Sequence, residues 1–423
     1  MSGMLGVYLG RKKNSDFTSA ANATNLSFVL LSPPRPIGLC FEGADYKYEL
    51  QRFLKSTKAN NASIFHPLKV IEAMSQFKTI EYKKLNGTQP VLMDVYSPPL
   101  PSADKIVALP IIVYIHGGAL TLGNRQDFFP TWLKDRVLAS GYAFVSIDYR
   151  LLIPITGKEV VEDIQDAFTF VSTHELPGEG YTFKLDGDRI GVAGHSAGGL
   201  AAVLATIHST PRPKVLVDVY GMGGNFFTGF HLNIKPGEVS MMNQTIPHLE
   251  PAEFAGFTYP YVKGLPPVVT EFPVGDFMAE DPAQRKDPRA NIYNFHFQRG
   301  NYLDYYTGLH EPSLSAALRS VLSKENPTLE DFKRVIPKDK QSLFPQLSID
   351  ANWPPTLLMH GTIDDAVLID ESRNLRDIIK ATGTPVELIE VEGVQHAWDY
   401  FPVAETTHSK EFDAVIEFVR KYL

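Results

Sequence analysis

The stretch Arg189–Gly199, RIGVAGHSAGG, decides how the rest of the chain is interpreted. Its apolar half, Ile190–Ala193, predicts a short buried strand, and the small residues after Ser196 predict the start of a helix. The glycines two positions on either side of the serine leave room for a sharp turn that lifts its side chain away from the backbone. A serine hydroxyl needs this exposure and a nearby base to act as a nucleophile. The stretch therefore predicts a nucleophilic Ser196, and an ordinary glycine-rich turn is the alternative.

Apolar and amphipathic segments alternate on both sides of this stretch. An Asn86-Gly87 turn between two alternating segments predicts an antiparallel hairpin at the start of the sheet. Buried strands and amphipathic helices in alternation predict an α/β fold, with a mostly parallel sheet covered by helices on both faces. The expected strands are 79–84, 89–96, 106–115, 142–147, 190–193, 214–220, 356–360 and 386–391, and the expected helices are 128–140, 159–174, 369–382 and 409–422.

The alternation divides the chain into three regions. Residues 76–221 and 354–423 are expected to form the α/β core. Residues 222–353 lack strands of the preceding kind and show short helical patterns at 313–323 and 328–335, which predicts a mostly helical cap insertion. Residues 1–75 are an N-terminal extension, and the sequence leaves open whether they form part of the cap.

Composition excludes several classes of protein. The 423 residues are 44% hydrophobic and 21% charged, which is typical of a globular enzyme. A net charge of −8 without a basic run argues against a nucleic-acid partner. No apolar run approaches the roughly 18 residues that span a membrane. The single cysteine, Cys40, excludes an internal disulfide, and we therefore expect a cytoplasmic location, although five Asn-x-Ser/Thr triplets weakly favour secretion.

A second segment with chemical potential is His116-Gly117-Gly118-Ala119, directly after an expected strand. Adjacent glycines at the end of a strand allow backbone N–H groups to point at a ligand oxygen, which is how an oxyanion is stabilised. A plain turn is the alternative for this segment. His116 itself is expected to be a structural hydrogen-bonding residue beneath the loop.

Two later loops supply a carboxylate and an imidazole. Asp364 and Asp365 follow the strand at 356–360, and either could accept the Nδ1 proton of a histidine, although we favour Asp364. His396 follows the last strand, where the topology brings it beside Ser196, and His408 is its less favoured rival. The order serine, aspartate, histidine is the one expected for a nucleophile on a strand–turn–helix element.

These motifs together resemble the α/β-hydrolase fold, and more narrowly the hormone-sensitive-lipase-like carboxylesterases of the fold-3 group. The resemblance rests on GHSAGG, HGGA, Asp148-Tyr149-Arg150-Leu151 and the Gly-Thr-x-Asp…His tail. It implies a triad of Ser196, Asp364 and His396. It also implies an oxyanion hole made by the amides of Gly118, Ala119 and Ala197, with Gly117 shaping the loop.

The sequence departs from the family pattern at three places. Ala119 stands where the family usually has a third glycine, and this requires a backbone angle compatible with a Cβ. His195 stands where an acidic residue usually precedes the nucleophile. The large insertion before the strand at 356–360 is unlike bacterial members, whose cap is mainly N-terminal.

The function expected from these residues is hydrolysis of a small-molecule carboxylic ester through an acyl-enzyme, without a metal or an organic cofactor. Aromatic residues of the insertion favour an apolar or aromatic acyl group if they line the site, although packing within the insertion is the alternative. A thioesterase or lactonase acting on a natural-product, polyketide-type acyl chain would use the same residues, and a non-catalytic ligand-binding homologue would retain only the pocket. The aromatic residues of the insertion meant here are Phe226, Phe227, Phe230, Tyr259, Tyr261, Phe295, Phe297, Tyr302, Tyr305 and Tyr306.

The sequence does not predict an oligomeric state.

Overall fold

A nine-stranded sheet runs through the structure, a computed structural model that describes residues 77–100, 105–261, 264–269 and 287–423. The predicted N-terminal extension, residues 1–75, lies outside these ranges. The order across the sheet is β1 (Phe77–Leu85), β2 (Gln89–Tyr96), β4 (Ala143–Ile147), β3 (Val107–Ile115), β6 (Thr182–His195), β7 (Leu216–Val219), β10 (Thr356–Gly361) and β11 (Val386–Val391), while β5 (Leu176–Pro177) pairs with β6.

The sheet is mixed at one side and parallel elsewhere. β1 and β2 form the predicted hairpin, and β2 also runs antiparallel to β4. The turn of the hairpin contains Asn86 and Gly87 at φ angles of 49° and 73°, which asparagine and glycine tolerate best. From β4 to β11 the main path of the sheet is parallel. The prediction of a mostly parallel α/β sheet is confirmed.

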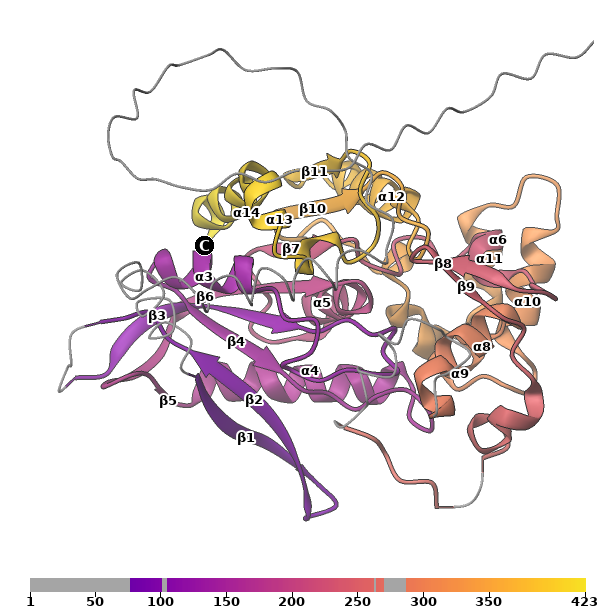
Figure 1. Ribbon diagram of the computed structural model, residues 1–423, viewed down its shortest axis with the longest axis horizontal. Helices are drawn as coiled ribbons and strands as arrows, with labels where there is room; N and C mark the ends of the chain where they lie inside the picture. Colours follow the sequence, from indigo (N-terminus) through magenta and orange to yellow (C-terminus); the bar gives the residue numbers. More distant parts are fainter. Residues whose placement is uncertain (1–76, 101–104, 262–263, 270–286) are drawn as a thin grey trace, which may run out of the picture. The chain divides into compact units, whose positions relative to one another are not determined.

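Helices cover both faces of this sheet (Figure 1). Along β3, Ile111, Val113 and Ile115 pack on one side, while Ile112 and Tyr114 pack on the other, because successive side chains of a strand point to opposite faces. The first side is covered by α4 (Gly157–Thr173), α5 (Ala197–His208) and α12 (Ile369–Ala381), and the second by α3 (Thr131–Ala139) and α14 (Ser409–Tyr422).

Two predicted elements begin three or more residues away from their predicted starts. The strand before Ser196 begins at Thr182 rather than at residue 190, because its polar first half pairs with β3 and β5. The helix predicted from residue 128 begins at Thr131. Phe128 has a φ angle of 49°, which lies outside the right-handed helical region.

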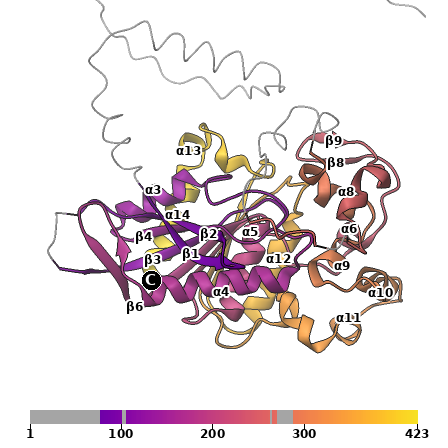
Figure 2. The same ribbon diagram turned by 90° about the horizontal axis from the view of Figure 1, so that it is seen from below.

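The segment between β7 and β10 consists mostly of short helices, and it gathers at one end of the sheet in both views (Figures 1 and 2). It also contains a small antiparallel sheet of two strands, which the sequence did not predict. Its elements are α6 (Gly229–Leu232), β8 (Val239–Met241), β9 (Gln244–Ile246), η1 (Pro251–Phe257), η3 (Pro288–Asn291), α8 (Ile292–Gln298), α9 (Tyr302–Thr307), α10 (Leu314–Leu322), α11 (Leu329–Val335), η4 (Lys338–Leu343) and η5 (Pro345–Leu347). After β11 the chain adds η6 (Trp398–Tyr400) and α13 (Ala404–Thr407) before α14.

Candidate active site

Ser196 occupies a strained turn between β6 and α5. Its backbone has φ 56° and ψ −125°, a conformation that a non-glycine residue adopts only where the surrounding structure imposes it. A Cβ on Gly194 would lie 1.9 Å from the carbonyl oxygen of Gly198, and a Cβ on Gly198 would lie 2.1 Å from that of Ile115. Both flanking glycines are therefore required by close backbone contacts, and the turn presents the serine hydroxyl beyond the end of the strand.

The structure brings the three residues of the predicted triad together at the carboxyl ends of β6, β10 and β11. The Nε2 atom of His396 lies 2.9 Å from Oγ of Ser196, and its Nδ1 atom lies 2.7 Å from Oδ2 of Asp364. Parallel strands place their carboxyl ends at one edge of the sheet, so residues far apart in sequence meet there. This geometry suits a histidine that accepts a proton from the serine while the carboxylate orients its ring.

Asp364 is buried and strongly hydrogen-bonded. Its Oδ1 accepts the backbone N–H groups of Ala366 and Val367, both at 2.9 Å. Burial acts to raise the pKa of Asp364, but the adjacent charge of His396 and hydrogen bonds from His360 and His396 outweigh it and hold the pKa below its usual range. Asp364 is therefore ionised at neutral pH.

The two residues that the sequence offered as alternatives for the triad, Asp365 and His408, make other contacts. Asp365 accepts the backbone N–H of Met242 at 2.6 Å, in the turn between β8 and β9. His408 packs against Trp398 with a ring-centroid distance of 4.6 Å and lies 4.0 Å from Glu411. The contacts of His408 are thus with the helical segment after the last strand, whereas His396 contacts the serine.

The predicted oxyanion residues border the serine. A Cβ on Gly117 would lie 3.2 Å from Cβ of Ser196, so this glycine lets the loop approach the nucleophile closely. Gly118 and Ala119 have φ angles of 98° and 53°, and among the described residues their amide groups donate no hydrogen bond. Ala197 is the first residue of α5, where an amide has no acceptor within the helix. Three amides next to Ser196 are therefore available to an oxygen of a ligand, and Ala119 tolerates the left-handed conformation.

His116 is fully buried beneath this loop, as expected of a structural residue. Its Nδ1 lies 2.8 Å from the carbonyl oxygen of Gly117, and its ring stacks on Tyr149 at 4.4 Å. Burial lowers the pKa of His116 to about 4, so the ring is neutral at physiological pH.

A second buried histidine–aspartate pair, which was not predicted from the sequence, lies next to the nucleophile turn. Nε2 of His195 lies 3.0 Å from Oδ2 of Asp399, which also accepts a hydrogen bond from Trp132 at 2.8 Å. Tyr220 donates to the other oxygen of Asp399, and its ring lies 4.6 Å from the ring of His396. The pair thus joins the residue before Ser196 to the loop that carries His396. No motif or spacing in the sequence indicates it.

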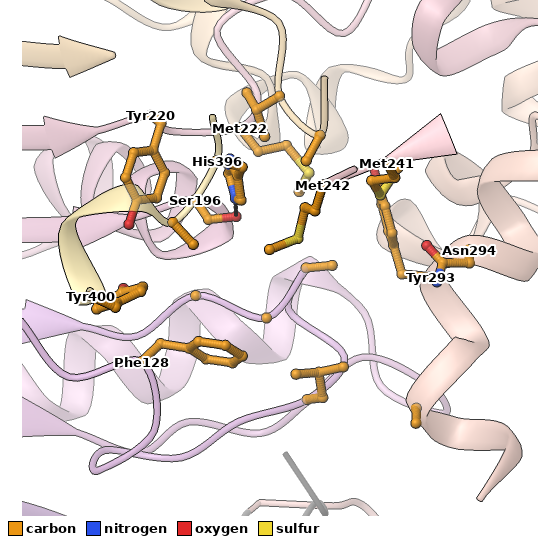
Figure 3. A pocket seen from close by; sticks show the side chains of 18 residues that line it. Phe128, Ser196, Tyr220, Met222, Met241, Met242, Tyr293, Asn294, His396 and Tyr400 are labelled. Carbon is orange, nitrogen blue, oxygen red and sulfur yellow. Dashed lines mark hydrogen bonds between the residues drawn. The ribbon is translucent and has the colours of Figure 1, made fainter. Parts of the chain in front are cut away.

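A pocket of about 690 Å³, partly open to solvent, begins at Ser196 and His396. Figure 3 shows Met241, Met242 and Tyr293 on one side of the serine and Phe128 and Tyr400 on the other. Its lining is mostly apolar, and Asn294 is one of few polar side chains in it. The other lining residues are Gly117, Gly118, Ala119, Leu122, Tyr220, Met222, Ala290, Ala366, Val367 and Ala397.

None of the ten aromatic residues proposed from the sequence lines this pocket. They pack within the insertion or against the core instead, which was the alternative interpretation. Phe227 stacks on Phe332 at 4.7 Å, and Phe295 stacks on Phe254 at 4.3 Å. Methionines and Tyr293 provide the apolar wall that was predicted for those aromatic residues.

The described ranges contain neither a metal-binding cluster nor a membrane-spanning helix. No group of three or more His, Cys, Asp or Glu side chains in them could hold a metal ion. No helix in them is long and apolar enough to cross a bilayer.

Known proteins resemble this chain in sequence. The BD-FAE family model matches residues 93–226, which include the serine turn and the glycine loop. Non-reducing polyketide synthase mapC' of Penicillium brevicompactum is 27% identical over 329 residues, which cover 74% of this chain and 14% of that protein. Non-reducing polyketide synthase ausA of Aspergillus calidoustus is 26% identical over 351 residues, covering 79% and 13%. The chain therefore spans only a small part of the length of these relatives.

One solved structure shares the architecture, and a second is similar to a lower degree. A Staphylococcus aureus protein, described as of unknown function, superimposes with a TM-score of 0.50 at 15% identity, covering 82% of this chain and 99% of that one. Thermogutta terrifontis esterase 2, phosphoramylated by tabun, gives a TM-score of 0.48 at 17% identity, covering 82% and 95%. The chain has the α/β-hydrolase fold, and the BD-FAE match confirms the predicted resemblance to esterase-like proteins of this fold.

Proposed function

We propose that this protein is a serine hydrolase that cleaves carboxylic esters of apolar or aromatic acyl groups through an acyl-enzyme intermediate. The observation that carries the proposal is the continuous contact from Ser196 through His396 to Asp364, with distances of 2.9 and 2.7 Å. A nucleophile, a base and a group that orients the base are the parts that acyl transfer to water requires.

In the proposed mechanism, Oγ of Ser196 attacks the ester carbonyl carbon while Nε2 of His396 takes its proton. Asp364 holds the Nδ1–H group and stabilises the imidazolium. The imidazolium then protonates the leaving alkoxide as the carbon–oxygen bond breaks. In the second half-reaction His396 takes a proton from water and the hydroxide attacks the acyl-enzyme. The bond to Oγ then breaks, and the imidazolium returns the proton to Ser196 as the carboxylic acid departs.

The amides of Gly118, Ala119 and Ala197 stabilise the negative oxygen that develops during both attacks. Such a donor typically contributes about 3–4 kcal/mol to transition-state stabilisation. Backbone amides suit this role because their directions are set by the loop and the helix start, and they do not reorganise during the reaction.

The pocket supports an apolar substrate. A lining dominated by methionine, alanine, valine and aromatic side chains favours burial of apolar surface, and it gives a charged acyl group few polar partners. Methionine side chains are flexible and polarisable, and they adapt to irregular ligands. An alkyl or aromatic acyl group is therefore the substrate class that the lining fits best.

The polyketide synthase relatives favour a second candidate function. In it the same residues release a polyketide-type acyl chain from a thioester, or open a lactone, rather than cleave an oxygen ester. The relatives named above are non-reducing polyketide synthases, and the regions similar to this chain cover most of it.

A covalent probe tests the proposed nucleophile. A fluorophosphonate should label the wild-type protein and leave the Ser196→Ala variant unlabelled, because the probe forms a bond to an activated serine oxygen. An unlabelled wild type would support a non-catalytic ligand-binding homologue and overturn the proposal. Comparable labelling of the variant would place the nucleophile elsewhere.

A substrate panel separates the two candidates. A p-nitrophenyl ester and an N-acetylcysteamine thioester of the same acyl group differ only in the leaving group, and a lactone adds a substrate whose leaving alkoxide stays attached to the acyl chain. The first candidate predicts that kcat/KM is highest for the ester, and the second predicts that it is highest for the thioester or lactone. The Ser196→Ala variant measures the uncatalysed background for each.

A further inference from the structure

The β8–β9 hairpin brings part of the insertion to the active site. Met241 pairs with Gln244 across the hairpin, so only Met242 and Asn243 form its turn. Both turn residues have positive φ angles, 54° and 58°. Asparagine adopts this conformation readily, whereas a methionine does so only where its surroundings hold it there.

Residues beside the triad hold this turn. Oδ1 of Asp365 accepts the backbone N–H of Met242 at 2.6 Å. Gln395 links the same groups: its Oε1 accepts the N–H of Asp365 at 3.0 Å, and its Nε2 donates to the side-chain oxygen of Asn243 at 3.3 Å. Asp365 and Gln395 directly follow and directly precede the two proposed triad residues of their loops. The strained methionine is therefore held by the loops that carry the candidate carboxylate and imidazole.

The held turn forms a wall of the pocket. Met241 and Met242 both line it, and Figure 3 shows the side chain of Met242 beside Ser196 and His396. Met241 also belongs to an apolar cluster with Ala366, the residue after Asp365, and with Phe295 of α8. The hydrogen bond to Asp365, the contact between Gln395 and Asn243, and the apolar cluster together hold this wall in place.

We propose that Asp365 is a positioning residue that sets the acyl-chain selectivity of the site through the Met241–Met242 wall. This inference rests on the proposed ester hydrolysis. Asp365 touches neither the nucleophile nor its base in this role. Its carboxylate accepts the hydrogen bond of the Met242 amide, and this contact fixes the thioether side chains of Met241 and Met242 beside the acyl group. A long apolar acyl chain buries more of its surface against the wall than an acetyl group does.

The test compares p-nitrophenyl acetate with p-nitrophenyl octanoate. We expect Asp365→Ala to raise KM for the octanoate about tenfold, because the wall loses its anchor, and to change kcat and the acetate parameters by less than about twofold. Asp365→Asn retains an oxygen acceptor and should restore the wild-type selectivity. Asp370→Ala, at an exposed site on α12, is the matched control.

A second variant separates selectivity from folding. Met242→Ala removes the wall but leaves the acceptor, and it should lose the same selectivity. Combining it with Asp365→Ala should add little, because both changes act on one wall. The amide of Met242 should exchange with solvent faster in Asp365→Ala than in the wild type, and this readout does not depend on catalysis.

Several results would overturn the inference. They are unchanged selectivity in Met242→Ala, equal loss of both substrates in a folded Asp365→Ala, and unchanged exchange at the Met242 amide. If Asp365→Ala does not fold, unchanged octanoate selectivity in Met242→Ala still overturns the inference. A wild type that fails to hydrolyse either ester and to react with the fluorophosphonate contradicts the proposed function instead, and the exchange measurement still tests the anchor.

Discussion

Gly198 shows how a single missing side chain supports the candidate site. The contact that a Cβ would make there, 2.1 Å from the carbonyl oxygen of Ile115, is with the backbone of β3. No change of rotamer relieves a clash with backbone, so the strand and the turn would have to separate. Gly256 offers a comparison, because no atom lies within 4 Å of the position of its Cβ and its φ angle is not positive.

We expect Gly198→Ala to lower the free energy of unfolding by about 1–3 kcal/mol. It should also reduce kcat/KM for p-nitrophenyl acetate, because the serine moves relative to His396. Gly256→Ala should leave activity unchanged and alter stability by at most about 1 kcal/mol. Urea unfolding and ester hydrolysis measure the two effects, and equal stability of the two variants would contradict this account.

At the scale of elements, the start of α4 illustrates what local sequence determines. Thr156 is its N-cap, and its hydroxyl oxygen accepts the N–H of Lys158 at 3.3 Å. Glu159 reaches back and accepts the N–H of Thr156 at 2.9 Å, which completes a capping box. The helix was predicted from residue 159 and begins two residues earlier, at Gly157. The capping signal is local, because Thr156 and Glu159 are three positions apart in the sequence.

We expect Thr156→Ala to destabilise the protein by about 1 kcal/mol, because the N–H of Lys158 at the start of α4 loses its acceptor. Thr169→Ala on the same helix is the control. Its side chain is exposed and bonds only to the carbonyl of Gln165 one turn earlier, so alanine should be neutral or slightly stabilising. Thermal unfolding of both variants gives the comparison, and equal losses would refute a capping role.

At the scale of the whole molecule, a buried acidic pair lies where the insertion leaves the core. Asp218 of β7 is buried, and burial, with the charge of Glu371 on α12, raises its pKa to about 8. Glu371 accepts the backbone N–H of Gly223 at 2.6 Å and lies 2.6 Å from Nε2 of His231 in α6. Asp218 is therefore protonated in the folded protein at neutral pH.

This pKa predicts a direction for stability against pH. Between the ordinary value of 3.8 and about 8, the folded state holds a proton that the unfolded state has released. The stabilising contribution of Asp218 to the free energy of unfolding is therefore complete below pH 3.8. It is lost as the pH rises from 3.8 to about 8. Asp218→Asn stays neutral, so it should flatten the decline, whereas Asp370→Asn at an exposed site should follow the wild type. Urea unfolding across the window measures this, and parallel wild-type and Asp218→Asn curves would contradict the assignment.

Several features of this fold could be predicted because their signals are local. Side-chain volume and hydrophobic period over a few residues predicted the hairpin, the buried strands and the helices of the core, and two glycines around Ser196 predicted the strained turn. The start of β6 was missed, because the polar residues from Thr182 onward pair with other strands and carry no apolar signal.

The sequence by itself determined the serine turn, the alternation of strands and helices, and the order of serine, aspartate and histidine, since each is written in neighbouring residues. The tertiary structure decided which of two adjacent carboxylates contacts the imidazole, and it brought together groups 32 and 200 positions apart. It also decided that Met241, Met242 and Tyr293, rather than the ten aromatic residues proposed from the sequence, line the pocket. The physical reason is that burial and hydrogen-bond distance between remote segments depend on how the strand ends and the insertion pack together.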